Sequence, residues 1–265
     1  MTDSSVNDYD DFERLSAALT AAVREHPALA GLALLGSASH VAASRRDEWS
    51  DHDFFAIAAP GAAADARYDL AWLPDQERLV LTAREGEIGF VAVYDDGHVF
   101  EFAVAEPGEL AGALAEEATV TVDDADSSVA RLIEESQARA SALPASDALN
   151  DTRLVLVKLL IGTGRVRRGE TINGGQFIRQ WAVKHLVQAV RGRVRAAVAE
   201  PAGIEPTRRF EAAYPAVAAE IDAALAQPAE RAAQSLFELT RRVLEPGWED
   251  FPTAAADAIA RRLGW

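Results

Sequence analysis

Residues 31–58 read GLALLGSASHVAASRRDEWSDHDFFAIA, and this stretch decides the fold. It begins and ends with short apolar runs, 31–35 and 53–58, whose lengths are typical of buried β-strands. Gly36 and Ser37 stop the first run, because glycine and serine favour turns over strands. The pattern therefore predicts two strands joined by a Gly-Ser turn, a short helix over residues 37–44 and a polar loop over residues 45–50.

Two aspartates stand at the start of the second strand. Asp51 and Asp53 are two residues apart, so the alternation of a strand puts both carboxylates on one face and His52 on the other. Mg²⁺ prefers such hard oxygen ligands when it also holds substrate phosphates. Gly36 and Ser37 lie between a strand and a helix, where backbone N–H groups can face a phosphate. We therefore expect a magnesium site beside a phosphate-binding turn.

A third carboxylate follows on a predicted hairpin. Residues 89–94 and 98–104 have strand character and are joined by Asp-Asp-Gly, a typical turn sequence. Glu101 alternates with Phe100 and Phe102, and a carboxylate in an apolar strand needs a partner if it is buried. A metal ion or a proton to abstract supplies that partner. Three carboxylates on adjacent strands fit in-line displacement at phosphorus.

Several alternatives stay open for these residues. Glu101 taken alone also fits a strand residue that faces water, and Asp95 or Asp96 competes with it as the third carboxylate. Both of those aspartates lie in a predicted turn, where aspartate is common for local reasons. Trp49 is expected to anchor its loop, with stacking on a nucleobase as the alternative.

The rest of the chain changes character along its length. Residues 8–25 have the spacing of an amphipathic helix, 118–122 fit one more strand, and the sequence after residue 127 is almost purely helical. The expected helices of this second part cover 129–142, 148–163, 177–198, 216–225 and 232–244. We therefore predict an α+β protein, with a mixed-sheet domain over 1–125 and a helical bundle over 126–265.

The charge distribution limits the classes of partner. The formal net charge is −16, which argues against a general nucleic-acid binder. The segment 151–195 differs, because it holds ten Lys or Arg residues and only two acids. A local basic surface suits a small polyanion such as a triphosphate, although a helix whose polar face uses arginine explains it equally well.

The composition also bears on the compartment. The chain has no cysteine, which excludes disulfides and thiolate metal sites. No stretch approaches the ~20 apolar residues that a membrane span needs. The acidic sequence MTDSSVNDYDDFER does not resemble a signal peptide. We therefore expect a cytoplasmic protein without membrane attachment.

The order of these motifs resembles that of the nucleotidyltransferase superfamily, which includes DNA polymerase beta and the antibiotic nucleotidyltransferases. Gly36-Ser37 follows a strand, Asp51 and Asp53 open the next strand, and Glu101 stands alone on a later one. Each motif by itself is common in unrelated proteins. The resemblance lies in their order and in the elements that carry them.

Within that superfamily, residues 47–53 look closest to antibiotic adenylyltransferases that act on aminoglycosides or lincosamides. Residues 164–170 resemble the Arg-Gly-Glu stretch in the helical domain of those enzymes. The motifs cover residues 31–104, and the helical second half agrees in layout. The chain departs from the family at one point. Members of the family usually have an arginine soon after this serine, and none follows soon after Ser37.

The resemblance implies a reaction and its metal ligands. A nucleoside monophosphate, AMP from ATP, would move to a hydroxyl of a small molecule such as an aminoglycoside, with release of pyrophosphate. Asp51 and Asp53 would hold Mg²⁺. Glu101 would be the third metal ligand or the base that deprotonates the acceptor hydroxyl. Glu170 is an alternative base, and it also fits an acid at a helix start.

The resemblance also implies contacts to the triphosphate. Gly36 and Ser37 would bind the outer phosphates, and cations of the helical domain, Arg168 and Lys184 among them, would neutralise the leaving pyrophosphate. The partners would be a nucleoside triphosphate and a hydroxylated small molecule. Two alternatives remain at this point: a protein acceptor, and a nucleotide-binding or interaction protein without turnover.

Overall fold

A mixed β-sheet organises the first half of the chain in this computed structural model, which describes residues 4–199 and 203–265. Within those residues, six strands form one sheet in the order β3-β4-β5-β2-β1-β6. The strands are β1 (Leu29–Leu35), β2 (His52–Ala58), β3 (Leu79–Glu85), β4 (Gly89–Tyr94), β5 (Val99–Ala105) and β6 (Ala118–Val122). Strands β2 and β5 are parallel, and the other neighbouring pairs are antiparallel. The expected mixed sheet is confirmed.

Strand β3 is not among the strands predicted from the sequence. It lies at the edge of the sheet beside β4, and its residues 80–85 are exposed. A strand that is exposed on both faces has no need of alternating apolar and polar residues. Periodicity therefore does not reveal it, whereas each of the five buried or half-buried strands is found within a few residues of its predicted position.

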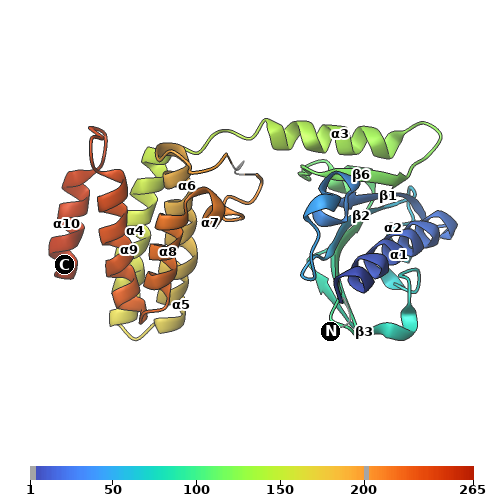
Figure 1. The fold of residues 1–265 in the computed structure, drawn as a ribbon, viewed down its shortest axis with the longest axis horizontal. Coiled ribbons are helices and arrows are strands. Elements are labelled where there is room, and N and C mark those ends of the chain that lie inside the picture. The colour runs from blue at the N-terminus through green and yellow to red at the C-terminus, as the bar shows by residue number, and fades with distance from the viewer. Residues whose placement is uncertain (1–3, 200–202) are drawn as a thin grey trace. The chain divides into compact units, whose positions relative to one another are not determined.

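Helix α1 (Ser4–Glu25) packs against β1 and β6 on one face of the sheet (Figure 1). The apolar residues whose spacing predicts this helix are buried, namely Phe12, Leu15, Leu19 and Val23. They share one core with apolar side chains of β2, β4 and β5. Burial of one such side chain contributes about 1.5–3 kcal/mol. This apolar face therefore accounts for the position of α1.

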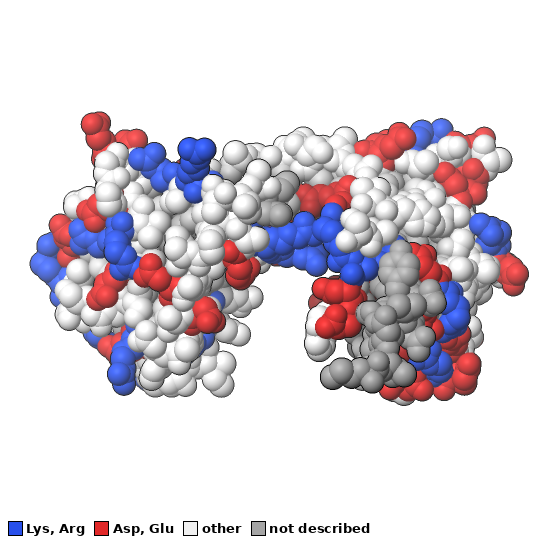
Figure 2. Space-filling view, in the orientation of Figure 1, with Lys and Arg blue, Asp and Glu red and all other residues white. Residues whose placement is uncertain are grey.

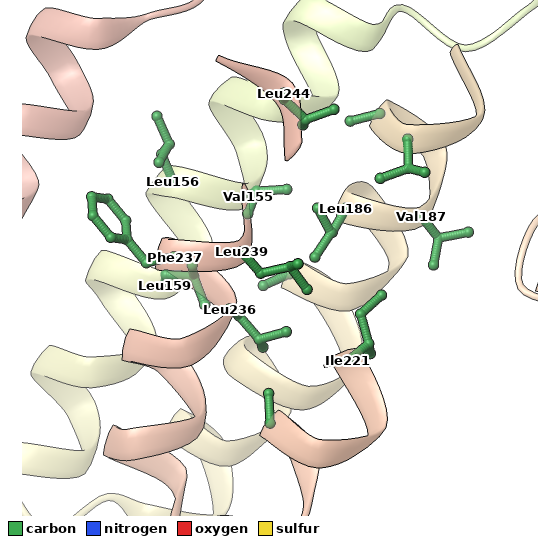
Figure 3. Close-up of a cluster of buried hydrophobic side chains, with 14 of the residues drawn as sticks. Val155, Leu156, Leu159, Leu186, Val187, Ile221, Leu236, Phe237, Leu239 and Leu244 are labelled. Carbon is green, nitrogen blue, oxygen red and sulfur yellow. The ribbon is translucent and has the colours of Figure 1, made fainter. Parts of the chain in front are cut away.

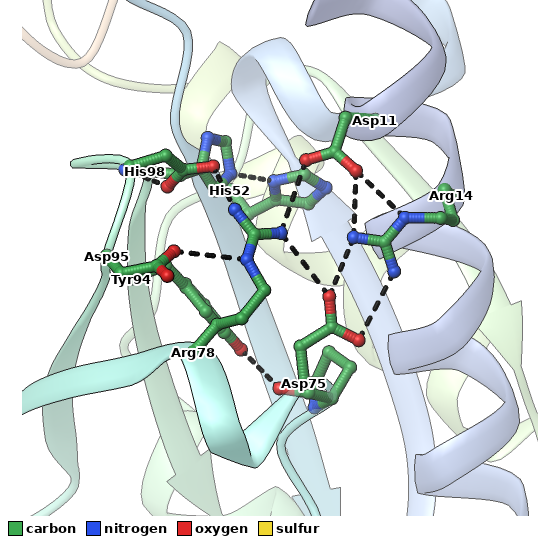
Figure 4. Close-up of polar contacts among 10 residues, drawn as sticks. Asp11, Arg14, His52, Asp75, Arg78, Tyr94, Asp95 and His98 are labelled. Carbon is green, nitrogen blue, oxygen red and sulfur yellow. Dashed lines mark hydrogen bonds and ion pairs between the residues drawn. The ribbon is translucent and has the colours of Figure 1, made fainter.

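Charged side chains also link α1 to the loop and hairpin beside it (Figure 4). Arg14 Nη2 donates to Asp75 Oδ2 at 2.6 Å, and Arg78 Nε donates to Asp95 Oδ1 at 3.1 Å. The hydrogen bond from Arg14 is the largest cause that holds the pKa of Asp75 below its ordinary value. These side chains are partly exposed, so each pair stabilises the fold by about 1 kcal/mol or less.

Shorter helical segments complete this half of the chain. They are α2 (Ala63–Tyr68), α3 (Ser128–Ser141) and the 3-10 segments η1 (Gly36–Ala38), η2 (His40–Arg45), η3 (Gln76–Arg78) and η4 (Pro107–Leu110). The single short helix expected over residues 37–44 is replaced by η1 and η2. The break lies at Ser39, which has extended backbone angles and caps η2 by accepting from Ala42 N at 3.3 Å.

Helices make up the second half of the chain, and their apolar faces form one core (Figure 3). They are α4 (Ala148–Arg167), α5 (Thr171–Gln176), the π-helical segment η5 (Phe177–Ala182), α6 (Val183–Arg193), α7 (Phe210–Ala213), α8 (Pro215–Leu225), α9 (Ala229–Leu244) and α10 (Thr253–Leu263). Figure 3 shows leucine and valine side chains of α4, α6 and α9 pointing toward one another.

Two features of these helices differ from the sequence-based expectation. The helix expected over residues 177–198 continues from α5, contains the π-helical turn η5 and ends at Arg193. Gly174 and Gly175 weaken the helical pattern of α5, since glycine lowers helix propensity by about 1 kcal/mol. Helices α7 and α10 are not among the predicted helices. Helix α5 is held by packing against α4 and η5, and α10 contributes to the helical core. Such tertiary contacts stabilise both segments.

The chain divides into two compact units, residues 1–143 and 144–265, named here the sheet unit and the helical unit. Helix α3 packs against β1 and β6 and belongs to the sheet unit. The α+β class, with a mixed sheet followed by a helical part, is confirmed. The domain boundary expected between residues 125 and 126 stays a prediction. None of the described helices has the length and apolar character that crossing a membrane requires.

The close approach of α4 to α5 and η5 gives a first prediction. A Cβ at Gly162 would lie 2.7 Å from Ile178 Cγ1 and 3.1 Å from the backbone oxygen of Gly174. Overpacking of this kind costs about 1–3 kcal/mol, so we expect Gly162→Ala to lower the free energy of unfolding by that amount in urea denaturation. Gly175→Ala is the control, because the space around its Cβ is open within the described residues. Equal effects of the two variants would contradict the prediction.

Candidate metal centre

The parallel pairing of β2 and β5 brings the three predicted carboxylates together. Asp53 and Glu101 are direct partners in the register of these strands, and Asp51 comes immediately before β2. One carboxylate oxygen from each of the three residues lies within 4.8 Å of the others. The group thus combines a spacing that the sequence shows with a register that only the sheet provides.

The two faces of these strands differ in character. His52 and Phe54 are buried on the face that packs against α1, whereas Asp51 and Asp53 are partly exposed. This alternation agrees with the prediction. Glu101 is exposed, so the argument that it needs a partner to offset burial is wrong. Its register opposite Asp53, rather than burial, is what places it in the group.

The Gly-Ser turn touches both aspartates. Gly36 has a φ of +48°, in the left-handed region that favours glycine, and a Cβ there would lie 3.3 Å from Asp53 Oδ2. Ser37 Oγ donates to the backbone oxygen of Asp51 at 2.9 Å and lies 3.4 Å from its Oδ1. The turn therefore lies directly beside the carboxylates, as the sequence predicts for a site that joins a metal to phosphates.

The close approach of Gly36 to Asp53 gives a second prediction. Alanine at a left-handed position costs about 1–2 kcal/mol, so Gly36→Ala should lower the free energy of unfolding by that amount. Its Cβ should also displace the Asp53 carboxylate and weaken Mn²⁺ binding, which electron paramagnetic resonance measures. Gly61→Ala is the matched control, because its φ is +77° and the space around it is open within the described residues. Equal Mn²⁺ affinities in the two variants would contradict the prediction.

A buried histidine, His52, lies between the two aspartates in the sequence and on the opposite face of the strand. His52 is fully buried, stacks on Phe12 with ring centroids 3.8 Å apart, and is hydrogen-bonded to Ser16 Oγ at 2.7 Å. Its Nδ1 lies 2.6 Å from His98 Nε2, a contact marked between the two rings in Figure 4, and the rings are arranged edge to face. Burial, with smaller contributions from His98 and Arg46, lowers the pKa of His52 to about 2. The ring is therefore neutral at neutral pH.

The donor set fits a divalent cation that prefers oxygen. Three carboxylates within this distance repel one another when ionised, and a divalent cation between them relieves that repulsion. Asp95 and Asp96, which competed for the third position, are instead bound to Arg78 at the hairpin turn. The described part of the chain thus supports Glu101 as the third acid.

Two cations and one acid predicted for the site lie in the helical unit. Lys184 is exposed on α6, and Arg168 follows α4 with its Nε donating to Glu170 Oε1 at 3.0 Å. The carboxylate group belongs to the sheet unit. The phosphate contacts expected of the two cations, and the role of Glu170 as a base, therefore stay predictions.

Several arginines of the basic segment bind within their own unit. Arg167 donates to Glu230, Arg179 to the backbone oxygens of Leu225 and Gln227, and Arg191 to that of Pro206. Figure 2 shows basic and acidic side chains interspersed on the surface of the helical unit. These contacts favour the alternative in which the arginines of segment 151–195 belong to the polar faces of the helices.

Trp49 differs from the expectation that it anchors its loop. Its side chain is 85% exposed, although its backbone N–H donates to Asp47 Oδ1 at 3.0 Å. A tryptophan that anchors a loop would bury its ring. The loop is instead held by its polar groups, such as the hydrogen bond from the Asp47 N–H to Ser50 Oγ at 3.0 Å.

Comparison with known proteins gives little beyond this geometry. No protein-family model matches the chain, and no curated protein matches it. The chain is similar to the crystal structure of an aminoglycoside 6-adenyltransferase from Bacillus subtilis, over 94% of this chain and 90% of that one. The sequence identity is 9% and the TM-score 0.27, which is too low to carry an argument about function.

Proposed function

We propose that this protein is a metal-dependent nucleotidyltransferase that moves AMP from ATP onto a hydroxyl of a small molecule. The observation that carries the proposal is the meeting of Asp51, Asp53 and Glu101 within 4.8 Å on adjacent strands. The Gly36-Ser37 turn in contact with both aspartates supports it, because a triphosphate bound to the metal needs a partner for its outer phosphates. The sequence resemblance to nucleotidyltransferases points the same way.

The residues divide the chemistry between them. The acceptor hydroxyl attacks the α-phosphorus, the bond to pyrophosphate breaks, and the proton of the hydroxyl passes to a base. Asp51 and Asp53 would hold Mg²⁺, which would offset the negative charge that develops on the leaving group. Glu101 is the exposed member of the group, and so an acceptor can reach it. It therefore suits either the third ligand position or the role of the base.

The proposed acceptor is a cationic, hydroxylated molecule such as an aminoglycoside. The formal charge of −16 supports this, because an acidic protein attracts a polycation. The likeness of residues 47–53 to antibiotic adenylyltransferases supports it as well. The roles of Arg168 and Lys184 as partners of the pyrophosphate, and of Glu170 as the alternative base, belong to the same proposal.

The test is pyrophosphate release with Mg²⁺ and each nucleoside triphosphate, across a panel of aminoglycosides and other hydroxylated compounds. Release that depends on one class of acceptor, with AMP found on that acceptor by mass spectrometry, would support the proposal. Tight Mg²⁺-dependent ATP binding without release would redirect the search to protein acceptors. If Mg²⁺ and ATP do not bind at all, the proposed function is wrong.

A further inference from the structure

The side chain of Arg46 is turned into the protein although its loop is exposed. Only 3% of the side chain is accessible to solvent. Its Nε donates to Ser37 O at 2.6 Å, and its Nη2 donates to Ala38 O at 3.1 Å and Ser39 O at 3.2 Å. One guanidinium group therefore binds three successive carbonyls of the Gly-Ser turn.

Contacts with α1 fix the other side of the same guanidinium. Its Nη1 forms an ion pair with Glu13, and its Cζ lies 4.6 Å from the centre of the Phe12 ring. Phe12 in turn stacks on His52, the residue between the two aspartates. Arg46 is thus the point at which α1, the turn and the strand β2 meet.

These contacts determine which way the turn faces. In a planar trans peptide the C=O and the following N–H point in opposite directions. Because three carbonyls point toward Arg46, the N–H groups that follow them point away from it: that of Ser39 donates to Gly36 O at 3.1 Å and that of His40 to Thr119 Oγ1 at 3.0 Å, and the N–H of Ala38 also lies on this side. The same turn places Gly36 against Asp53 and the Ser37 hydroxyl on Asp51. Loss of the guanidinium would free the turn to rotate and would remove these contacts.

We propose that Arg46 is a positioning residue that holds the Gly36–Ser39 turn in the orientation that receives the triphosphate. This inference rests on the proposed function. A phosphate-binding arginine would present its guanidinium to solvent, whereas Arg46 directs four contacts inward. Its place in the sequence hides the role, because Arg46 comes nine residues after Ser37 and the fold of η2 brings it back.

The test compares Arg46→Lys and Arg46→Ala with Arg45→Ala by steady-state kinetics. Lysine keeps the charge but cannot reproduce the planar fork of arginine that spans three carbonyls. Both Arg46 variants should raise KM for Mg–ATP about tenfold or more, because small displacements of positioning groups have effects of this size. KM for the acceptor should stay unchanged. Arg45→Ala should leave both constants unchanged, since Arg45 pairs with Glu117 on the surface.

Two controls separate the possible outcomes. Circular dichroism and thermal unfolding show whether each variant folds, and Arg46→Lys serves if Arg46→Ala does not. An active protein whose Arg46→Lys variant keeps the original KM for Mg–ATP would overturn this inference and leave the proposed function standing. Equal rises in both KM values would indicate a general structural role and would also overturn it. If the unmodified protein binds no Mg–ATP, the proposed function fails and this inference fails with it.

Discussion

Replacement of Asp53 by asparagine should lower the rate of nucleotidyl transfer by about 10²–10³-fold while the protein stays folded. Loss of a metal ligand removes several kcal/mol of transition-state stabilisation, and each 1.36 kcal/mol is about tenfold in rate. Asparagine has nearly the shape of aspartate, so the close contact with Gly36 can persist. The measurement is pyrophosphate release at saturating Mg²⁺ and ATP.

The control for this prediction is a nearby acid outside the carboxylate group. Glu48 is exposed in the loop that leads to Asp51, and Glu48→Gln removes the same unit of charge. We expect its rate to stay within about twofold of the unmodified protein, because this exposed side chain is not a member of the carboxylate group. An Asp53→Asn variant with the activity of Glu48→Gln would show that the carboxylates do not hold a catalytic metal.

The protein should lose stability between pH 7 and pH 5 because of His52. The pKa of this buried ring is lowered to about 2 in the folded state, while the unfolded chain binds a proton near pH 6.5. The stabilisation is therefore complete above pH 6.5 and falls progressively as the pH drops below it. One such group lowers the free energy of unfolding by about 2 kcal/mol between pH 7 and pH 5. The pKa of His98 is also lowered by burial, and it adds in the same direction.

Urea denaturation at several pH values between 7 and 5 tests this prediction. Carboxylates whose pKa is lowered, such as Asp75 and Asp96, lose their stabilisation only below their ordinary pKa near 3.8, outside this window. His52→Gln removes the titrating ring and can retain a hydrogen bond to Ser16. Its free energy of unfolding should depend less steeply on pH than that of the unmodified protein. Equal slopes would show that another group controls acid unfolding.

Local sequence patterns were sufficient for the elements with a strong apolar signal. Helix α1 has four apolar residues at helical spacing, and β1 and β2 are short apolar runs between turn residues. Each of these patterns reports which face must be buried. Strand β3 lacks a comparable signal because it is an exposed edge strand. Helix α10 does have one, since its buried Ala256, Ile259 and Leu263 follow helical spacing, and the prediction missed it.

Part of the candidate site could be predicted in the same way. Asp51 and Asp53 are two residues apart on a strand, and so their common face follows from the chain alone. The Gly36-Ser37 turn follows from the residues that interrupt an apolar run. Glu101 was predicted from the cost of burying a carboxylate in an apolar strand. That reason is wrong, since its side chain is exposed. Arg46 and Ser16 gave no local signal, because their partners are distant in the sequence.

The sequence by itself determined the fold class, the faces of the strands and the pair of aspartates, because these depend on residues within a few positions of one another. Only the tertiary structure decided that β5 lies parallel to β2 with Glu101 opposite Asp53, and that Arg46 folds back under the Gly-Ser turn. The physical reason is that strand register and side-chain contacts depend on how distant segments pack together, which no local spacing records.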